Sequence, residues 1–362
     1  MSLYSYIVNM KKRFLSLFLT LVLILQVFTL LSCERNKNKY TAYSIDFFDT
    51  ATSVTGYAKN RKTFDKVTEE IFSVFEEYHK LSNIYQRYDG LANLCTVNDL
   101  KDGQHECIKV DSRLIDMLLY AKEMYNKTNG NVNIAMGSVL SIWHNYRTFG
   151  IDDPSSAQLP KKEKLEAARD HMNIDDIIID EENSTVFIKD PKLTIDVGAI
   201  AKGYAVEMAA RMLEEKGIEG YVINAGGNVR TVGLKGDGTK WVAGITNPDE
   251  DSDDSYIAYL DLSGEALVTS GSYQRFYIVN GKSYHHIIDP ETLMPAEGYL
   301  SVSIVAKSSA EADALSTALF CMSFKEGYAL IESLPDVEAF WALSDGSFKE
   351  SSGFSLYLSD KY

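Results

Sequence analysis

The sequence predicts an α+β protein that forms a single large unit, with mostly antiparallel sheets flanked by helices. Two patterns support this prediction. Segment 65–81 repeats apolar residues at helical spacing, as an amphipathic helix does. Beyond residue 217, short apolar segments are separated by turn sequences such as Lys235-Gly236-Asp237-Gly238, which is typical of antiparallel strands. No long Pro-, Gly- or Ser-rich linker divides the chain.

The elements follow in order from local patterns. Segment 41–57 alternates in polarity and predicts one strand. Further strands are expected at 174–180, 185–188, 220–224, 229–234, 241–246, 256–262, 273–279 and 300–306. Helices are expected at 65–81, 112–126, 135–146, 202–216 and 308–322. The run 152–156 reads as a surface loop, and the acidic run 249–254 as a solvated turn without the glycine of a calcium loop.

The N-terminus has the pattern of an export signal. A basic patch at residues 11–13 precedes the apolar segment 14–31, and Ser32 stands directly before Cys33. This predicts a signal peptide at 1–32, lipidation of Cys33, a tether at 33–40 and a folded domain at 41–362. An uncleaved membrane helix is the alternative. We expect an exported, membrane-anchored lipoprotein on the periplasmic face of the inner membrane, although the residues do not distinguish inner from outer membrane.

Charge and cysteine content narrow the class of protein. Removal of residues 1–32 takes away three positive charges and no negative one, which changes the formal charge from −15 to −18. So acidic a chain is not expected to bind nucleic acid through a basic patch. A phosphorylated ligand would need a cation, backbone amides or placed lysines. A Cys95–Cys107 disulfide and a pair of buried free thiols are both open alternatives.

Asp313 and Thr317 form a candidate metal site. They are four residues apart in the expected helix 308–322, so their oxygens leave the same face one turn apart. Such a pair suits Mg²⁺, which takes few protein oxygens and keeps water and substrate phosphates as its other ligands. A solvated helix face is the alternative interpretation. The carbonyl of Ala199, at a tight turn, is a third candidate ligand.

Two further residues have chemistry that suits phosphate transfer. Lys202 falls in the first turn of a helix, where the dipole disfavours a cation, so an anion is expected nearby unless the side chain is simply exposed. His285 and His286 point to opposite faces if their segment is extended, so only one can serve a site. An imidazole is the natural base for activating a hydroxyl at neutral pH.

Small and hydroxylated residues end two of the expected strands. Gly226 and Gly227 would let backbone approach a ring or a phosphate closely, although a plain hairpin turn also explains them. The segment 269–271, Thr-Ser-Gly, is followed by Arg275 and suits a ribityl-phosphate chain, with a polar turn as the alternative.

These motifs resemble the ApbE family of FAD:protein FMN transferases over almost all of the mature chain. The matching segments are 196–203 (DVGAIAKG), 224–228 (NAGGN), 269–271 (TSG), 286–290 (HIIDP) and 312–318 (ADALSTA). The resemblance implies an ApbE-like, T-fold-like unit that uses Mg²⁺ and FAD. It also implies transfer of FMN through a phosphoester to a Thr or Ser of a membrane redox protein, with release of AMP. Hydrolysis of FAD to FMN and AMP is an expected side activity.

The resemblance also implies roles for individual residues. Asp313, Thr317 and the Ala199 carbonyl would bind Mg²⁺, and His286 with Lys202 would be catalytic. The expected flavin-site residues are Thr50, Asn83, Lys202, Gly226, Gly227, Asn228, Thr269, Ser270, Gly271, Arg275 and Asp289. The expected partners are FAD, the acceptor subunit and the membrane. Assembly as a homodimer is left open.

Several positions depart from the family pattern. Asn228 replaces a frequent Asp, segment 132–135 does not match the usual Phe-Asp-x-Thr, and Leu293 stands in place of a Gly. Asn83 lies where many members have an aromatic residue, so we expect a site more open to water. A non-catalytic FAD-binding or storage lipoprotein is the alternative function, but storage needs neither metal ligands nor a base. A solute-binding lipoprotein would show two α/β lobes, which the sequence lacks.

Overall fold

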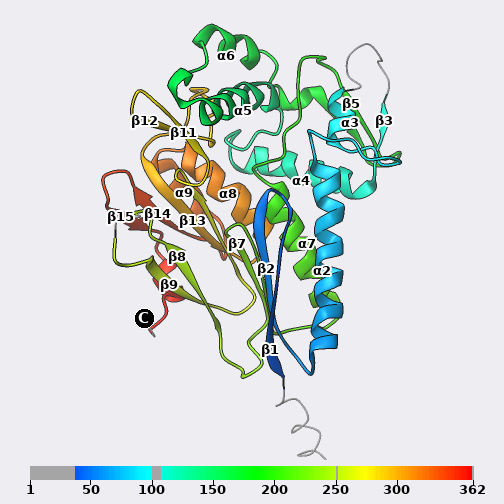
Figure 1. Cartoon of the computed structure of the whole chain (residues 1–362), viewed down its shortest axis with the longest axis vertical. Helices are drawn as coiled ribbons and strands as arrows, with labels where there is room; N and C mark the ends of the chain where they lie inside the picture. The colour runs from blue at the N-terminus through cyan, green and yellow to red at the C-terminus, as the bar shows by residue number, and fades with distance from the viewer. Residues whose placement is uncertain (1–36, 100–106, 250–251, 361–362) are drawn as a thin grey trace, which may run out of the picture.

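An antiparallel sheet of eight strands forms the centre of the molecule (Figure 1). The computed structural model describes residues 37–99, 107–249 and 252–360, so the predicted signal peptide and Cys33 lie outside the described residues. The strands run in the order β1-β2-β6-β7-β10-β13-β14-β15. Their bounds are β1 Asn38–Phe47, β2 Thr50–Ala58, β6 Tyr221–Ala225, β7 Asn228–Val232, β10 Ala266–Gly271, β13 Tyr299–Ala306, β14 Glu338–Leu343 and β15 Phe348–Glu350.

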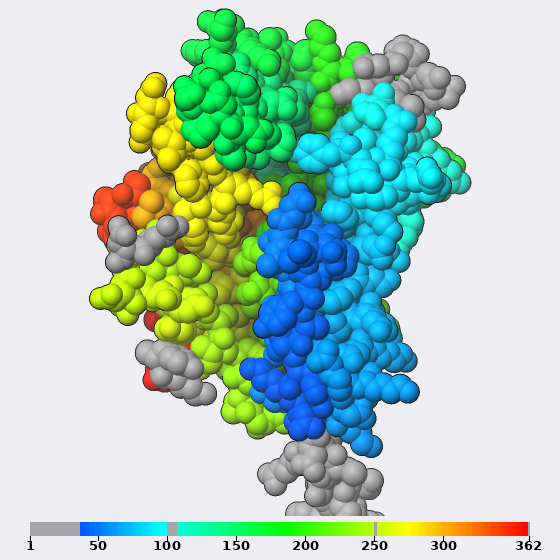
Figure 2. Space-filling model, viewed as in Figure 1, coloured from blue at the N-terminus to red at the C-terminus, as the bar shows by residue number. Residues whose placement is uncertain are grey.

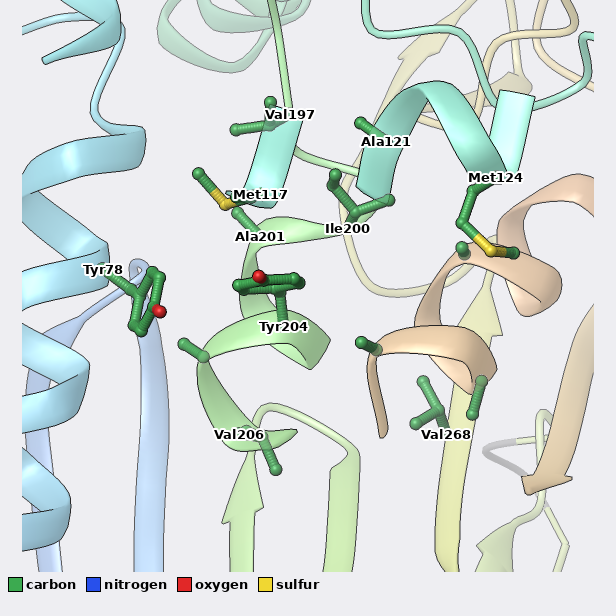
Figure 3. Close-up of a cluster of buried hydrophobic side chains, with 14 of the residues drawn as sticks. Tyr78, Met117, Ala121, Met124, Val197, Ile200, Ala201, Tyr204, Val206 and Val268 are labelled. Carbon is green, nitrogen blue, oxygen red and sulfur yellow. The ribbon is translucent and has the colours of Figure 1, made fainter. Parts of the chain in front are cut away.

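Three helices pack on this sheet and on one another: α2 (Arg61–Ser82), α7 (Ala201–Glu215) and α8 (Ser309–Cys321). The apolar stripe of α2 includes Phe64, Ile71 and Phe75, all fully buried, which explains why the helix lies against the sheet. Tyr78 of α2 meets Tyr204 of α7 edge to face, with ring centroids 5.5 Å apart (Figure 3). The main core therefore joins all three helices to the central sheet.

Smaller elements surround this centre. The helices are α3 Leu94–Asp99, α4 Ser112–Lys127, α5 Gly137–Asp152, α6 Lys162–Arg169 and α9 Phe324–Ser333. The additional strands are β3 Ile108–Lys109, β4 Ile177–Asp180, β5 Thr185–Ile188, β8 Trp241–Thr246, β9 Tyr256–Leu262, β11 Phe276–Val279 and β12 Lys282–His285. In Figure 1, α5, α6 and the β11–β12 hairpin lie together at one end of the molecule. Within the described residues, no helix combines the length and apolar character needed to cross a bilayer.

The structure confirms the α+β class and corrects several boundaries. Segment 41–57 is two strands of a hairpin, because the chain reverses at Phe48 and Asp49, which have φ angles of 55° and 51°. The sequence has no Asn-Gly or Gly-Gly signal there. Instead, tertiary contacts hold the turn: the Phe48 N–H donates to His79 Nδ1 at 3.1 Å, and the Phe48 ring contacts Phe75.

Other corrections are smaller. Helix α5 continues from the predicted end at 146 to Asp152, and Pro154–Ser156 forms a 3-10 turn where a loop was expected. Strand β11 begins at Phe276 rather than at 273. Cys95 and Cys107 are both free thiols, and Cys95 is buried as the free-thiol alternative expected, but Cys107 is exposed.

Candidate active site

A cavity of about 710 Å³ opens where the β1–β2 turn, α5, α7 and α8 converge. The residues that the sequence predicted for the site and that line this cavity are Thr50, Asn83, Ala199, Lys202, Gly226, Thr269, Ser270, Arg275, His286, Asp313 and Thr317. At the rim, the Arg275 guanidinium donates to the Asp49 carbonyl at 3.2 Å. This contact joins the β1–β2 hairpin, blue in Figure 2, to the yellow segment that carries β11 and β12.

The turn that carries Ala199 and Lys202 is held by the core. Val197, Ile200 and Ala201 are buried beside α4, as Figure 3 shows. Val197 and Ala201 also reach the cavity wall, where they stand beside Ala199 and Lys202. Burial of these apolar side chains fixes the start of α7 relative to the site.

Asp313 and Thr317 lie on the cavity side of α8. One carboxylate oxygen of Asp313 accepts the Gly203 N–H at 2.7 Å, and the other is 3.6 Å from Lys202 Nζ. A Cβ at Gly203 would lie 2.3 Å from the Asp313 Cβ and 2.5 Å from the Ser309 carbonyl. Only glycine therefore permits this approach of α7 to α8.

The donor set around Asp313 fits Mg²⁺. It offers one carboxylate, the Thr317 hydroxyl and the Ala199 carbonyl, all oxygen atoms on the wall of one cavity. No group of three or more His, Cys, Asp or Glu side chains in the described part of the chain could hold a metal ion. Magnesium is commonly bound by one or two protein carboxylates plus water and substrate phosphates.

Lys202 is positioned by Asn228. The Lys202 ammonium donates to Asn228 Oδ1 at 2.5 Å. Asn228 itself is fully buried and does not line the cavity, and its amide nitrogen has no hydrogen-bond partner among the described residues. The amide therefore aims the ammonium without neutralising its charge, which an Asp at this position would do.

His286 lines the cavity as a neutral imidazole. Its Nδ1 is 3.2 Å from the Arg275 carbonyl, which can only accept, so Nδ1 carries the hydrogen and Nε2 keeps its lone pair. Burial, reinforced by the charges of Arg147, Arg275 and His285, lowers the pKa of His286 from 6.5 to about 3. Nε2 is thus available to accept a proton.

His285 has a structural environment. Its Nε2 donates to the Ala296 carbonyl at 2.9 Å, its Nδ1 accepts the Ile287 N–H at 3.2 Å, and its ring packs edge to face on Phe320. It is not among the cavity-lining residues. The two neighbouring histidines are therefore in different surroundings.

Several predicted flavin-site residues help to shape the wall. Gly226 has a φ of +55°, and a Cβ there would lie 2.1 Å from Thr50 Oγ1, so glycine is required beside Thr50. The hydroxyls of Thr269 and Ser270 each bond a neighbouring serine at 2.8 Å, and for Ser270 this is Ser316 of α8. The Ser270 bond ties strand β10 to the helix that carries Asp313, and the Thr269 bond, to Ser303, ties β10 to β13.

The remaining predicted residues have other surroundings. Gly227, Asn228, Gly271 and Asp289 do not line the cavity. Asp289 accepts the Glu291 and Thr292 N–H groups and so stabilises a turn. Asn83 does line the cavity, but its side-chain oxygen accepts two loop amides, each at 2.8 Å, and its nitrogen donates to Tyr88. Its polar atoms therefore organise the loop that follows α2.

Sequence reasoning missed the wall formed by α5. Its cavity-lining residues follow helical spacing: Met136, Leu140, Trp143, His144 and Arg147. The periodicity within 135–146 could have revealed most of this face, but Arg147 lies one residue beyond the predicted end.

Further cavity-lining residues were missed, among them Asp49, Tyr85 and Asp196. Tyr85 packs on His144 with ring centroids 5.3 Å apart, and places an aromatic side chain at the mouth two residues after Asn83. Burial raises the pKa of Asp196, whose carboxylate accepts the Gly198 N–H at 2.8 Å. No local sequence signal marks Asp49, because its position depends on the unexpected turn.

Comparison with known proteins identifies relatives over most of the chain. The profile of the ApbE family matches residues 41–341. The FAD:protein FMN transferase of Vibrio cholerae O395 is 30% identical over 296 residues, which cover 80% of this chain and 84% of that protein. The FAD:protein FMN transferase of Klebsiella pneumoniae strain 342 is 28% identical over 268 residues, which cover 71% of this chain and 80% of that protein.

The fold is shared with a solved relative. The crystal structure of the ApbE protein from Thermotoga maritima matches with a TM-score of 0.76 and 27% identity, and covers 89% of this chain and 100% of that one. Because the family profile spans most of the sequence and the same architecture recurs in the solved relative, this chain belongs to the ApbE family.

Proposed function

We propose that this protein is a Mg²⁺-dependent FAD:protein FMN transferase that attaches FMN to a Thr or Ser of an acceptor protein. The observation that carries the proposal is the sharing of one cavity by the oxygen donors of α8 and the neutral imidazole of His286. The names of the relatives support the same activity. A storage protein has no need for this combination of groups.

The reaction follows from the geometry. The acceptor hydroxyl oxygen attacks the FMN phosphorus of FAD, and its proton passes to Nε2 of His286. The bond between that phosphorus and the bridging oxygen breaks, and AMP leaves with the bond's electron pair. Asp313, Thr317 and the Ala199 carbonyl would hold Mg²⁺, which neutralises pyrophosphate charge. Lys202, directed by Asn228, contributes a second positive charge beside Asp313.

We also infer that FAD hydrolysis is a minor activity. Water in place of the acceptor hydroxyl would yield FMN and AMP by the same displacement. The absence of an aromatic side chain at Asn83 favours hydrolysis, whereas the Tyr85–His144 pair at the mouth disfavours it by restricting water. The balance between the two activities depends on how fully the acceptor covers the mouth.

Anchoring is part of the proposal. Lipidation of Cys33 would hold the exported protein on a membrane, with the acceptor being a subunit of a membrane redox complex. Two or more acyl chains give stable anchoring, which one chain does not.

The test compares turnover with storage. The protein lacking its signal peptide is incubated with FAD, with Mg²⁺ or EDTA, and with or without the extracytoplasmic domain of a candidate acceptor subunit. We expect AMP to form in Mg²⁺ and not in EDTA, and to increase with the acceptor. Stable FAD binding without AMP under every condition would support the storage function instead.

A further inference from the structure

Two arginines in the cavity lack a carboxylate partner. Arg147 of α5 and Arg275, just before β11, both line it. Arg147 contacts His144 Nδ1 at 3.1 Å, and Arg275 donates to the Asp49 carbonyl at 3.2 Å. Within residues 37–99, 107–249 and 252–360, neither guanidinium forms an ion pair, although the chain is strongly acidic. By contrast, the cavity lysine, Lys202, faces Asp313.

The position of Arg147 on α5 gives the cavity wall two different parts. Met136, Leu140 and Trp143 form an apolar stretch, and His144 and Arg147 continue the same helix face as a polar end. Such a wall matches a ligand with an apolar ring at one end and an anion further along. FAD and FMN both have this distribution, and riboflavin has the ring without the anion.

The two guanidiniums also act on each other. Both side chains line the same cavity, and burial together with the charge of Arg275 lowers the pKa of Arg147. An anion between them would relieve this repulsion. Arginine presents a planar fork that binds phosphate through two parallel hydrogen bonds, so phosphate is the anion that best fits the pair.

We propose that Arg147 and Arg275 form a phosphate-binding pair that holds a phosphate of the FAD pyrophosphate beside His286. The inference rests on the proposed function and adds a substrate-binding residue, Arg147, on an element that carries no predicted site residue. Because His286 contacts the Arg275 carbonyl, the pair also lies next to the base that receives the acceptor proton.

The test separates phosphate recognition from other roles by a ligand series. The full-length protein in detergent, with EDTA present, is titrated with riboflavin, FMN, FAD and AMP, and binding is followed by flavin fluorescence or calorimetry. Arg147→Gln should lower the affinity for FMN and FAD by about 10-fold or more, as expected for the loss of a charge-assisted hydrogen bond. The affinity for riboflavin should fall by less than about twofold. If the variant instead loses affinity for AMP and not for FMN, the pair binds the adenylate phosphate of FAD.

Two variants control the experiment. Arg147→Lys keeps the positive charge but loses the planar guanidinium, so its affinity for FMN and FAD should lie between those of wild type and Arg147→Gln. Arg87→Gln removes an arginine that is paired with Asp99 and does not line the cavity, so it should change no affinity. If Arg147→Gln lowers the affinities for riboflavin and FMN equally, or changes neither, the inference is overturned. Phosphate-selective weakening without AMP release by wild type would support the pair and count against transferase activity.

Discussion

At the scale of single residues, the neighbouring histidines show how surroundings assign chemistry. His286 keeps an unprotonated nitrogen at the cavity, whereas both nitrogens of His285 bond the backbone. The sequence motif alone could not decide between the two histidines. The choice depends on which of the two side chains at the C-terminal end of β12 points into the cavity.

This difference leads to the first prediction. His286→Ala should lower the rate of FMN transfer by about 10² to 10⁴, the usual cost of losing a general base. AMP release without acceptor should fall less, because a metal ion can itself activate water. His285→Ala should affect transfer much less. Flavin attached to the acceptor is measured by in-gel fluorescence and AMP by chromatography. Equal losses in both reactions would mean that His286 is not the base for the acceptor.

The lowered pKa of His286 predicts an unusual pH profile. The base works in its neutral form, so transfer declines only when the pH falls through the pKa of the free enzyme. Because that pKa lies below 6.5, the acidic limb of kcat/KM should lie below pH 6.5 as well. Bound phosphates offset the arginine charges, so the limb for kcat should lie at higher pH than the limb for kcat/KM. Limbs in the reverse order would contradict this assignment.

The metal assignment predicts a specific loss at Asp313. Asp313→Ala removes the only charged ligand proposed for Mg²⁺, so AMP release should fall to background while flavin binding persists. Initial rates across a Mg²⁺ titration provide the measurement. Ser316→Ala, one residue before Thr317, is a matched control that removes a hydroxyl bonded to Ser270 rather than a proposed ligand. Wild-type cleavage by Asp313→Ala would refute the metal site.

At the scale of elements, the site depends on the close approach of α7 to α8. Glu207 of α7 is buried, accepts the Ser309 N–H at the start of α8 at 2.8 Å, and pairs with Arg230 of β7 at 3.1 Å. This buried pair and the Gly203–Asp313 bond fix the register of α8 against α7. The pair belongs to a larger network, because Arg230 also contacts Glu214 at 2.7 Å and Glu207 also contacts Arg211 at 3.0 Å.

Gly203→Ala tests this packing. The added methyl would overlap the Asp313 side chain and the Ser309 backbone, and overpacking of this kind costs about 1–3 kcal/mol. We expect a lower melting temperature and loss of AMP release. Gly327→Ala in α9 is the control, since its methyl would meet the flexible Leu319 side chain instead. Full activity of Gly203→Ala would show that the α7–α8 contact does not position Asp313.

The elements also show how far the sequence could be read. Periodic segments such as α2 and α8 were predicted with small shifts at their ends, because their apolar faces are local signals. The β1–β2 turn was missed because His79 and Phe75, distant in sequence, hold it. Motifs in the sequence identified Asp313, Thr317, Lys202 and His286, which share the cavity. They did not identify the α5 wall, because Arg147 is recognisable only once the fold places that helix face on the cavity.

At the scale of the whole molecule, β1 separates the predicted anchor from the site. The described chain enters the fold at the start of β1, and the opposite end of this strand leads into the turn at the cavity (Figure 1). A strand of 10 residues spans roughly 30 Å, so the cavity lies at about that distance from the point where the predicted tether joins β1. If Cys33 is lipidated as proposed, the acceptor hydroxyl would have to reach the cavity at this distance from the membrane surface.

Anchoring itself is testable. Cys33 lies outside the described residues, and its replacement by Ala should leave the precursor without lipid. The folded domain should remain active when produced without its signal. Detergent-phase partitioning of both forms provides the measurement. A processed Cys33→Ala protein that partitions with the detergent as wild type does would refute lipidation at this residue.

The central claim is that this cavity transfers FMN from FAD to a protein hydroxyl. The most direct measurement is the intact mass of a purified acceptor domain after incubation with the protein, FAD and Mg²⁺, followed by peptide mapping. The account predicts a mass increase of one FMN phosphoester on a single Thr or Ser, with an equal amount of AMP. An unchanged acceptor mass while AMP accumulates would contradict it, and would show an FAD hydrolase in place of a transferase.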